Sequence, residues 1–190
     1  MIFFTADTHF YHKNIIKYCK RPFSSIGEMN EALIQNWNET VSPGDVVYHL
    51  GDFAHCCKPH EAISIRKMLN GKIVLIIGSH DRMVEYLKPY LAATCDILHL
   101  KPFDGDDKMS ITLCHHPFLS WPCAHYGTWH LFGHHHGNLR LPAEIMGKSF
   151  DCGVDCWDYK PISLDRVIEE MKPLHNGFNY ISPEKRRQKA

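Results

Sequence analysis

The sequence predicts an α/β protein in which a parallel β-sheet is followed by a second, mixed sheet. Short apolar runs rich in Ile, Val, Phe and Leu recur along the chain, and they are too short for helices and too continuous for half-exposed strands. Segments with helical periodicity separate the early runs, whereas the runs beyond residue 96 are shorter and closer together. Because 190 residues with 44% hydrophobic content suit one compact core, we expect a single domain.

The apolar runs are expected to form buried strands. Five of them span residues 2–6, 46–50, 73–77, 111–114 and 129–132. The alternation of strand and helix in the first half is typical of βαβ units, which place successive strands in a parallel sheet. The later strands then form the second, mixed sheet.

Helical patterns lie between the early strands and near the end of the expected domain. They cover residues 12–19, a segment that begins at Ser25, a segment after Pro59, and residues 163–171. Ser25 and Glu28 have the spacing of a capping box, in which each residue satisfies a backbone N–H of the first helical turn. In the helix that they begin, Met29, Leu33 and Trp37 share one apolar face.

The expected domain covers residues 1–172, and residues 173–190 are expected to form a partly flexible C-terminal extension. This extension holds the one basic run of the chain, formed by Lys185, Arg186, Arg187 and Lys189. A basic run in a polar tail is typical of a solvated end rather than of a binding site.

The charge balance excludes several classes of partner. The 21 basic and 21 acidic side chains give a formal net charge of zero, so neither duplex nucleic acid nor an anionic membrane surface is favoured as a partner. No apolar run is long enough to span a bilayer. The eight cysteines lack C-x-x-C pairs, and the N-terminal segment has the pattern of a strand rather than a secretory signal. We therefore expect a cytoplasmic protein with reduced thiols.

Histidine is unusually abundant, with 15 residues, and its placement indicates a function. Each of the five expected strands is followed by Asp or His. These residues are Asp7 and His9, Asp52, His80 and Asp81, His115, and His134 to His136. In open α/β sheets, ligands bind beyond the carboxyl ends of the strands, so residues far apart in sequence can meet there.

The mixture of imidazole and carboxylate predicts a transition-metal site. Such a set favours Mn, Fe or Zn over Ca, and a carboxylate with two oxygens can bridge two ions. A pair of ions can activate water and stabilise the charge that develops in phosphoryl transfer. The sequence has neither a G-x-S-x-G elbow nor a P-loop, which disfavours serine hydrolases and P-loop nucleotide triphosphatases.

The motifs together resemble the calcineurin-like metallophosphoesterase superfamily, in the form of a small member without a cap domain, of bacterial or phage type. They are Asp7-x-His9, Gly51-Asp52, Gly78-Ser79-His80-Asp81, His115 after a strand, and Gly133-His134-His135-His136. The resemblance covers roughly residues 1–160. It implies a four-layer α/β/β/α sandwich of two mixed sheets flanked by helices, with a dinuclear metal site at one end.

The resemblance also implies a role for each matched residue. It assigns the first metal ion to Asp7, His9 and His136, the bridge to Asp52, and the second ion to His115 and His134. His80 is then expected to stabilise the transition state or protonate the leaving oxygen, and Asp81 to orient the His80 ring. Two divalent ions are expected, Mn first, with Fe, Zn or Ni as alternatives.

One position departs from the superfamily pattern. Where the third motif normally has Asn as a ligand of the second ion, this sequence has Ser79. A serine hydroxyl reaches less far than an amide, so Ser79 is expected to bind the second ion weakly, directly or through water.

Other polar residues are weaker candidates. His12, Asn14 and Arg21 follow the first motif and are candidates for phosphate binding, with helix capping and surface solubility as an equal alternative. His116 is expected to point away from the site because it directly follows His115, and the same holds for His135 beside His134. His49 is expected to be a satisfied core residue. The remaining histidines, including His55 and His130, are expected to be surface or structural residues, with one or two of them lining the cleft.

The leading function is hydrolysis of a phosphate ester, with in-line attack by a hydroxide that bridges the two ions. A phosphodiester is slightly favoured over a monoester, with a nucleotide as one candidate substrate. Two alternatives stay open, namely a catalytically impaired metal-binding or scaffold member of the same fold, and a nuclease component that acts on nucleic-acid ends. The neutral composition argues against the nuclease, and the oligomeric state is not predicted.

Overall fold

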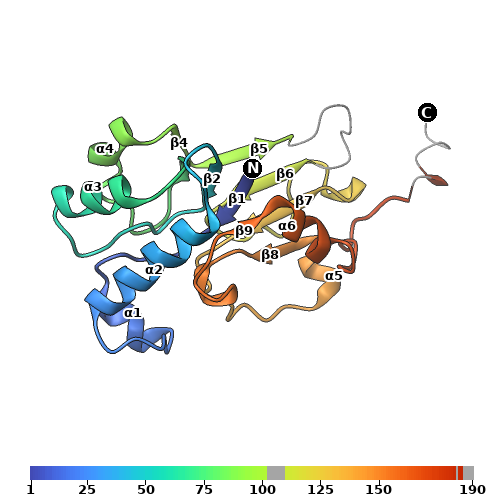
Figure 1. Cartoon of the computed structure of the whole chain (residues 1–190). Helices are drawn as coiled ribbons and strands as arrows, with labels where there is room; N and C mark the ends of the chain where they lie inside the picture. Colours follow the sequence, from blue (N-terminus) through green and yellow to red (C-terminus); the bar gives the residue numbers. More distant parts are fainter. Residues whose placement is uncertain (102–109, 183, 186–190) are drawn as a thin grey trace.

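Two mixed β-sheets flanked by helices make up the computed structural model, which describes residues 1–101, 110–182 and 184–185 (Figure 1). The predicted α/β sandwich is confirmed. Its strands are β1 (Ile2–Thr5), β2 (Val46–His49), β3 (Lys72–Ile76), β4 (Ala93–Cys95), β5 (Ile97–Leu100), β6 (Ile111–Cys114), β7 (Trp129–Phe132), β8 (Ser149–Asp151) and β9 (Ile162–Ser163). Its α-helices are α1 (Lys13–Tyr18), α2 (Ile26–Thr40), α3 (Pro59–Met68), α4 (Val84–Leu87), α5 (Ala143–Met146) and α6 (Leu164–Met171).

The first sheet has the strand order β4-β3-β2-β1-β9. The strands β1 to β4 are parallel, as the alternation of strand and helix predicts, and the short β9 pairs antiparallel with β1. The parallel arrangement brings the carboxyl ends of β1, β2 and β3 to the same edge.

The second sheet has the order β5-β6-β7-β8, with β5 antiparallel to β6 and the other pairs parallel. The strands β6 and β7 have the predicted bounds. Four strands were not predicted, namely β4, β5, β8 and β9. Three of them have only two or three residues, which is too short to show a period, whereas β5 has four residues of half-buried and exposed character.

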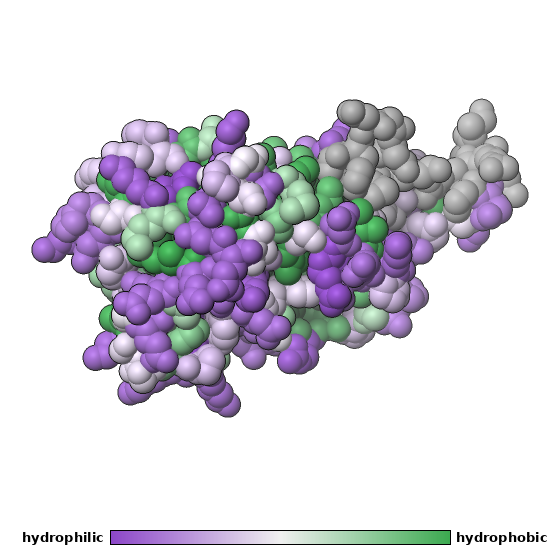
Figure 2. Space-filling view, in the orientation of Figure 1, coloured by the Kyte–Doolittle hydropathy of each residue, from purple (hydrophilic) through white to green (hydrophobic). Residues whose placement is uncertain are grey.

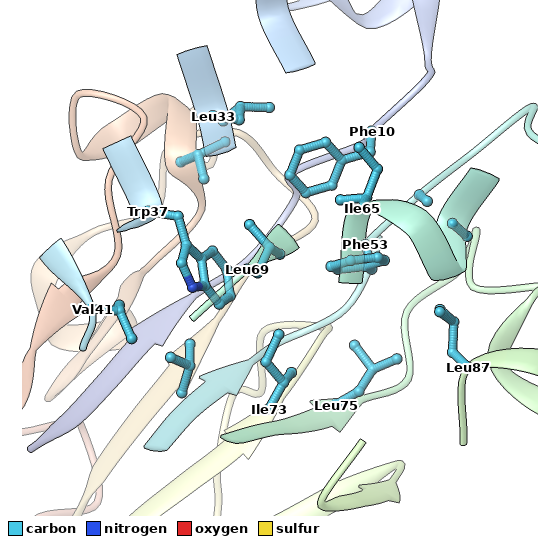
Figure 3. Close-up of a cluster of buried hydrophobic side chains, with 14 of the residues drawn as sticks. Phe10, Leu33, Trp37, Val41, Phe53, Ile65, Leu69, Ile73, Leu75 and Leu87 are labelled. Atoms are coloured by element: carbon cyan, nitrogen blue, oxygen red, sulfur yellow. The ribbon is translucent and has the colours of Figure 1, made fainter. Parts of the chain in front are cut away.

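Two apolar cores hold the layers together. The first lies between the first sheet and helices α1 to α3, where Leu33 and Trp37 of α2 pack toward Ile73 and Leu75 of β3 (Figure 3). The second lies between the two sheets. It joins Phe4, Leu50 and Ile76 to Ile111, Leu113 and Leu131, with Val167 and Met171 of α6 packed against them.

Helix α2 begins as its capping sequence predicts. The Ser25 side chain accepts a hydrogen bond from the Glu28 backbone N–H, but the Glu28 carboxylate accepts from the backbone of Ser24 rather than Ser25. Met29, Leu33 and Trp37 are buried, and hydrophilic side chains dominate the surface over α1 and α2 (Figure 2).

The C-terminal segment contacts the body of the protein. The Phe178 N–H donates to the Glu144 carbonyl, the Ile181 N–H donates to the His125 carbonyl, and Leu174 packs on the second core. Of the predicted basic run, residues 186–190 lie outside the described residues. None of the described helices combines the length and apolar character that a membrane crossing requires.

His130 of β7 is a buried histidine with two hydrogen-bond partners, in agreement with the structural role expected for it. Its Nδ1 donates to the Thr112 carbonyl at 2.9 Å, and its Nε2 accepts from the Phe118 N–H at 3.1 Å. His49 is likewise fully buried, with Nε2 2.9 Å from the Thr8 hydroxyl, but its Nδ1 has no hydrogen-bond partner among the described residues, so the expectation of a satisfied residue holds for one ring nitrogen only. Because the Nε2 atom of His130 accepts a hydrogen bond, the buried imidazole of His130 in the second sheet is neutral.

This burial predicts acid sensitivity, since it lowers the pKa of His130 from 6.5 to about 4. The stabilisation is complete above pH 6.5, where both states are neutral, and it is lost toward pH 4 because only the unfolded chain binds the proton. The loss should be about 3 kcal/mol in unfolding free energy, at about 1.4 kcal/mol per pKa unit. Urea unfolding of the wild type and His130→Gln should show the wild type's advantage shrinking over this pH range. A constant difference would contradict the assignment.

Candidate metal centre

The loops that follow β1, β2, β3, β6 and β7 meet at one edge of the two sheets, as their sequences predict. Hydrogen bonds join them directly. The Asp7 N–H donates to the Gly51 carbonyl at 2.9 Å, and the Gly133 N–H donates to the His115 carbonyl at 3.0 Å. Across the two sheets, the His134 N–H donates to Asp7 Oδ2 at 2.8 Å. Residues from both halves of the chain thus form one site.

The backbone at this edge is unusual. Five of the predicted ligands have positive φ angles, namely Asp7 (56°), His9 (50°), Asp52 (56°), His134 (71°) and His136 (49°). Asp and His tolerate this left-handed region better than most residues, yet each such residue costs about 1 kcal/mol or more. Such conformations gather at functional sites, where they direct side chains that a regular strand would turn elsewhere.

Two glycines let the loops after β2 and β3 approach each other. A Cβ atom on Gly78 would lie 2.4 Å from the Asp52 nitrogen and 2.5 Å from its Oδ1 atom. Gly51 has a φ of 93°, and a Cβ there would lie 2.6 Å from the Gly78 Cα. The Gly-Asp and Gly-Ser-His-Asp motifs therefore keep glycine for close packing around Asp52.

The first ligand group consists of Asp7, His9 and His136, whose ligand atoms lie within 4.8 Å of one another. The His9 and His136 rings are 5.2 Å apart. Asp7 uses Oδ2 to accept from the His134 backbone, which leaves Oδ1 buried without a hydrogen-bond partner. This is the group that the superfamily resemblance assigns to the first ion.

Asp52 lies between this group and a second ligand group, which includes His115 and His134. Its Oδ2 atom is 3.4 Å from His9 Nε2 and 3.5 Å from His115 Nε2, and its Oδ1 accepts from the His80 N–H at 2.7 Å. His115 donates from Nδ1 to the Leu50 carbonyl at 2.8 Å, which turns Nε2 toward Asp52. Burial lowers the pKa of His115, but the Asp52 carboxylate raises it above its ordinary value, so a metal ion would have to displace a proton there as well. Asp52 thus occupies the place of a bridging carboxylate.

Unpaired polar atoms test whether this site suits metal ions. Five buried side-chain atoms of the described residues have no hydrogen-bond partner, namely Thr5 Oγ1, Asp7 Oδ1, His9 Nε2, His49 Nδ1 and His115 Nε2. The atoms of Asp7, His9 and His115 belong to the two ligand groups. A buried polar atom without a partner costs about 1–3 kcal/mol, and a pair of cations bound to these atoms would remove that cost. The residues present therefore fit divalent ions.

The pKa values of these residues also suit the binding of metal ions. Burial raises the pKa of Asp7 to about 7. It lowers the pKa of His9 to about 2 and that of His134 to about 4, which keeps both imidazoles neutral and able to bind metal. Burial alone would raise the pKa of Asp52, but the interaction with His115 brings it below its ordinary value. A divalent ion would stabilise the buried Asp7 carboxylate.

Asp155, which the sequence analysis missed, orients His136. Its Oδ2 accepts from His136 Nδ1 at 2.6 Å, the usual arrangement when the other ring nitrogen faces a metal. Burial would lower the pKa of His136, but the Asp155 carboxylate raises it to about 10, so a metal ion would have to displace a proton there. Asp155 belongs to a short 3-10 turn (Val154–Cys156) that shows no strand-end pattern in the sequence.

Arg21 does not face an open phosphate site, although it was expected as a candidate for phosphate binding. Its guanidinium is buried and donates to both Asp155 oxygens, at 2.8 and 2.7 Å, and to the carbonyls of Asp7 and Thr8. With its donors used in this way, Arg21 fixes the first ligand loop and the Asp155 carboxylate. Arg21 is thus a neighbour of the first motif, but its role is structural rather than substrate binding.

Asp81 does not orient the His80 ring, which corrects the expectation for this residue. Its carboxylate is buried and accepts from the backbone N–H groups of Asp52, Phe53 and Gly78, each at 2.8 Å. Three such bonds to one carboxylate hold the loop after β2 against the loop after β3. Asp81 therefore positions Asp52.

His80 lies beside the first ligand group, together with two further histidines. Its ring is 5.5 Å from that of His9, 6.2 Å from that of His12 and 4.4 Å from that of His55. The structure thus places the candidate His12 at the site and adds His55, which had been treated as surface or structural. Asn14 instead is exposed and lines a separate pocket between α1 and the start of α2.

His116 lies at the site, contrary to the expectation that its side chain points away. The ligand nitrogens of His115, His116 and His134 lie within 4.8 Å of one another. Ser79 is also present there, with its Oγ 3.4 Å from His116 Nε2. The alternation of side chains that motivated the expectation applies within a strand, but β6 ends at Cys114.

Comparison with known proteins identifies a relative of this chain. No protein-family model matches the sequence. The uncharacterized protein MJ1445 of Methanocaldococcus jannaschii is 37% identical over 172 residues, which cover 88% of this chain and 89% of that protein. The chain belongs to the MJ1445 family.

Two further proteins resemble this member of the MJ1445 family. The Gene 66 protein of Mycobacterium phage D29 is 24% identical over 201 residues, covering 93% of this chain and 98% of that protein. The crystal structure of the protein of unknown function AQ665 from Aquifex aeolicus has a TM-score of 0.67 and 27% identity, covering 90% of this chain and 98% of that one. MJ1445 is described as uncharacterized and AQ665 as a protein of unknown function.

Proposed function

We propose that this protein is a dinuclear metal-dependent phosphoesterase of the calcineurin-like metallophosphoesterase type. One observation carries the proposal, namely the buried and unpartnered ligand atoms of Asp7, His9 and His115 beside the Asp52 carboxylate. Unpaired atoms of this kind are rare in folded proteins and call for an explanation such as a bound ion. Two adjacent ligand groups that share one carboxylate suit a pair of ions.

The two ions would be held by ligands of mixed type. Asp7, His9 and His136 would bind the first ion, His115 and His134 the second, and Asp52 would bind both. Carboxylate with imidazole suits Mn first, with Fe, Zn or Ni as alternatives. Ions bound here would lower the pKa of a coordinated water and offset the negative charge on phosphate oxygens.

The side chains around the metal centre supply the remaining chemistry. His80 lies next to His9, so its imidazole can reach the leaving oxygen of an ester bound at this edge and give it a proton. The hydrogen bond from the His80 backbone to Asp52 Oδ1 fixes His80 relative to the bridging carboxylate. His12 and His55 flank it and can contact phosphate oxygens.

A phosphodiester, such as a nucleotide derivative, fits this site slightly better than a monoester. A pocket beside His80 is lined by His55, Arg82 and Met83 among other residues, and it offers room for one organic arm of a diester. Arg82 can balance the charge of a phosphate there.

All eight cysteines are free, which supports action in a reducing cytoplasm.

Hydrolysis assays with chelator-treated protein test this function. We expect no cleavage of bis-p-nitrophenyl phosphate without metal, recovery when Mn²⁺ is added, and slower cleavage of p-nitrophenyl phosphate. Faster cleavage of the monoester would reverse the proposed ester preference, but it would still support phosphoesterase activity. If Mn, Fe, Zn and Ni each bind but none restores cleavage of either ester, the protein is a metal-binding member without this activity.

A further inference from the structure

The second ligand group contains one imidazole more than the proposed function uses. His115, His116 and His134 place ligand nitrogens within 4.8 Å of one another, a spacing compatible with a shared ion. The His116 ring is 4.4 Å from the His134 ring and 4.9 Å from the His115 ring. His116 therefore lies as close to the two assigned ligands as they lie to each other, at 5.2 Å.

The local backbone explains how two consecutive residues reach one site. β6 ends at Cys114, and His115 and His116 lie in the bend that follows. In a continuing strand their side chains would point to opposite faces of the sheet. In the bend, His115 faces the buried interior while His116 reaches the same centre from the solvent side, since it is exposed.

Ser79 adds a reason for a ligand at this place. It occupies the loop position next to His80, but its short hydroxyl lies 3.4 Å from His116 Nε2, the length of a weak hydrogen bond. Ser79 thus contacts His116. The imidazole of His116 extends farther from its backbone than the hydroxyl of Ser79, and either of its nitrogens can bind a metal.

We propose that His116 is a ligand of the second metal ion and that Ser79 supports its ring. The second ion then has three imidazoles, from His115, His116 and His134, together with the Asp52 carboxylate. This inference rests on the proposed dinuclear centre, and it deepens that function by making the two metal sites chemically different.

The two ligand sets predict different metal preferences. The first site combines two carboxylates, from Asp7 and Asp52, with the imidazoles of His9 and His136. The second site has one carboxylate and three imidazoles. Because imidazole favours Zn over Mn, the second site should be the more selective for Zn. A mixed pair, with a harder ion in the first site and Zn²⁺ in the second, is therefore expected.

Metal binding without substrate tests the inference. The full-length wild type and His116→Ala are dialysed against increasing Zn²⁺ or Mn²⁺, and bound metal is counted by elemental analysis. We expect two Zn²⁺ per wild-type chain, and for His116→Ala a second Zn²⁺ that binds about 100-fold more weakly with the first unchanged. The matched control is His135→Ala, which removes the next histidine of the His134 loop and should leave both affinities unchanged.

A rescue variant separates a ligand from a structural residue. In Ser79→Asn/His116→Ala, the longer amide should recover much of the lost Zn²⁺ affinity, because Asn can reach the place that the imidazole left. His116 is exposed, so loss of the fold in His116→Ala is not expected, and circular dichroism checks it. Unchanged binding of the second Zn²⁺ in His116→Ala would overturn the inference, whatever the hydrolysis assays show. Weaker Zn²⁺ binding would support it even if neither ester were cleaved.

Discussion

Replacing Asp52 with Asn is expected to lower the rate of phosphate-ester hydrolysis at least about 1,000-fold, or about 4 kcal/mol in activation free energy. Asp52 Oδ2 lies 3.4 Å from His9 Nε2 and 3.5 Å from His115 Nε2, so it faces both ligand groups. An amide has nearly the same shape but lacks the negative charge that would hold two cations together. The fold should survive because Asn can still accept from the His80 backbone.

The measurement is the steady-state cleavage of bis-p-nitrophenyl phosphate with saturating Mn²⁺, together with bound metal per chain. Asp158→Asn is a matched control. It makes the same chemical change at an exposed residue that also has a positive φ, of 51°. Its rate should equal that of the wild type. A rate for Asp52→Asn within about tenfold of the wild type would be incompatible with a bridging role.

Asp81→Ala should have the largest effect on stability, a loss of about 3–5 kcal/mol in the free energy of unfolding. The variant leaves the N–H groups of Asp52, Phe53 and Gly78 without their acceptor. Because these amides belong to the loops around Asp52, the proposed bridging carboxylate, metal affinity should fall as well.

Urea unfolding of the chelated protein measures this loss without a contribution from bound metal. Asp96→Ala provides the control, since it removes an exposed aspartate and should change stability by less than about 0.5 kcal/mol. The opposite result, an unchanged stability with a reduced turnover, would restore the role that the sequence suggested, in which Asp81 orients His80.

The sequence predicts the strands and helices of this protein better than the roles of individual side chains at the candidate metal centre. The strands β6 and β7 and the buried face of α2 follow from apolar patterns that are long enough to read. The placement of Asp or His after five strands correctly indicates that these residues meet, because parallel strands share an edge. Strands such as β8 and β9 have no period to detect, since they are held by pairing with neighbours distant in sequence.

Residues whose roles depend on tertiary contacts were assigned less well. Asp155 reaches His136 from a short turn that carries no motif. The same carboxylate accepts hydrogen bonds from Arg21, which lies 134 residues earlier in the chain. Asp81 follows His80 directly, which suggested a partnership, but its carboxylate turns toward the backbone instead. For His116, the end of a strand decides the direction of the side chain, and strand ends are the least certain part of a sequence-based assignment.

The pairing of β1 with β9 has a consequence for how this protein is made. β1 precedes every other strand of its sheet in the chain, yet it lies inside the sheet, between β2 and a strand that begins at Ile162. The chain must therefore be synthesised through β9 before β1 acquires its second neighbour, and through His136 before the Asp7 loop can meet that residue. Such distant pairing slows folding, and the proposed ligand set stays incomplete until His136 has emerged. The nascent N-terminal part alone then lacks the complete ligand set with which to capture a metal ion.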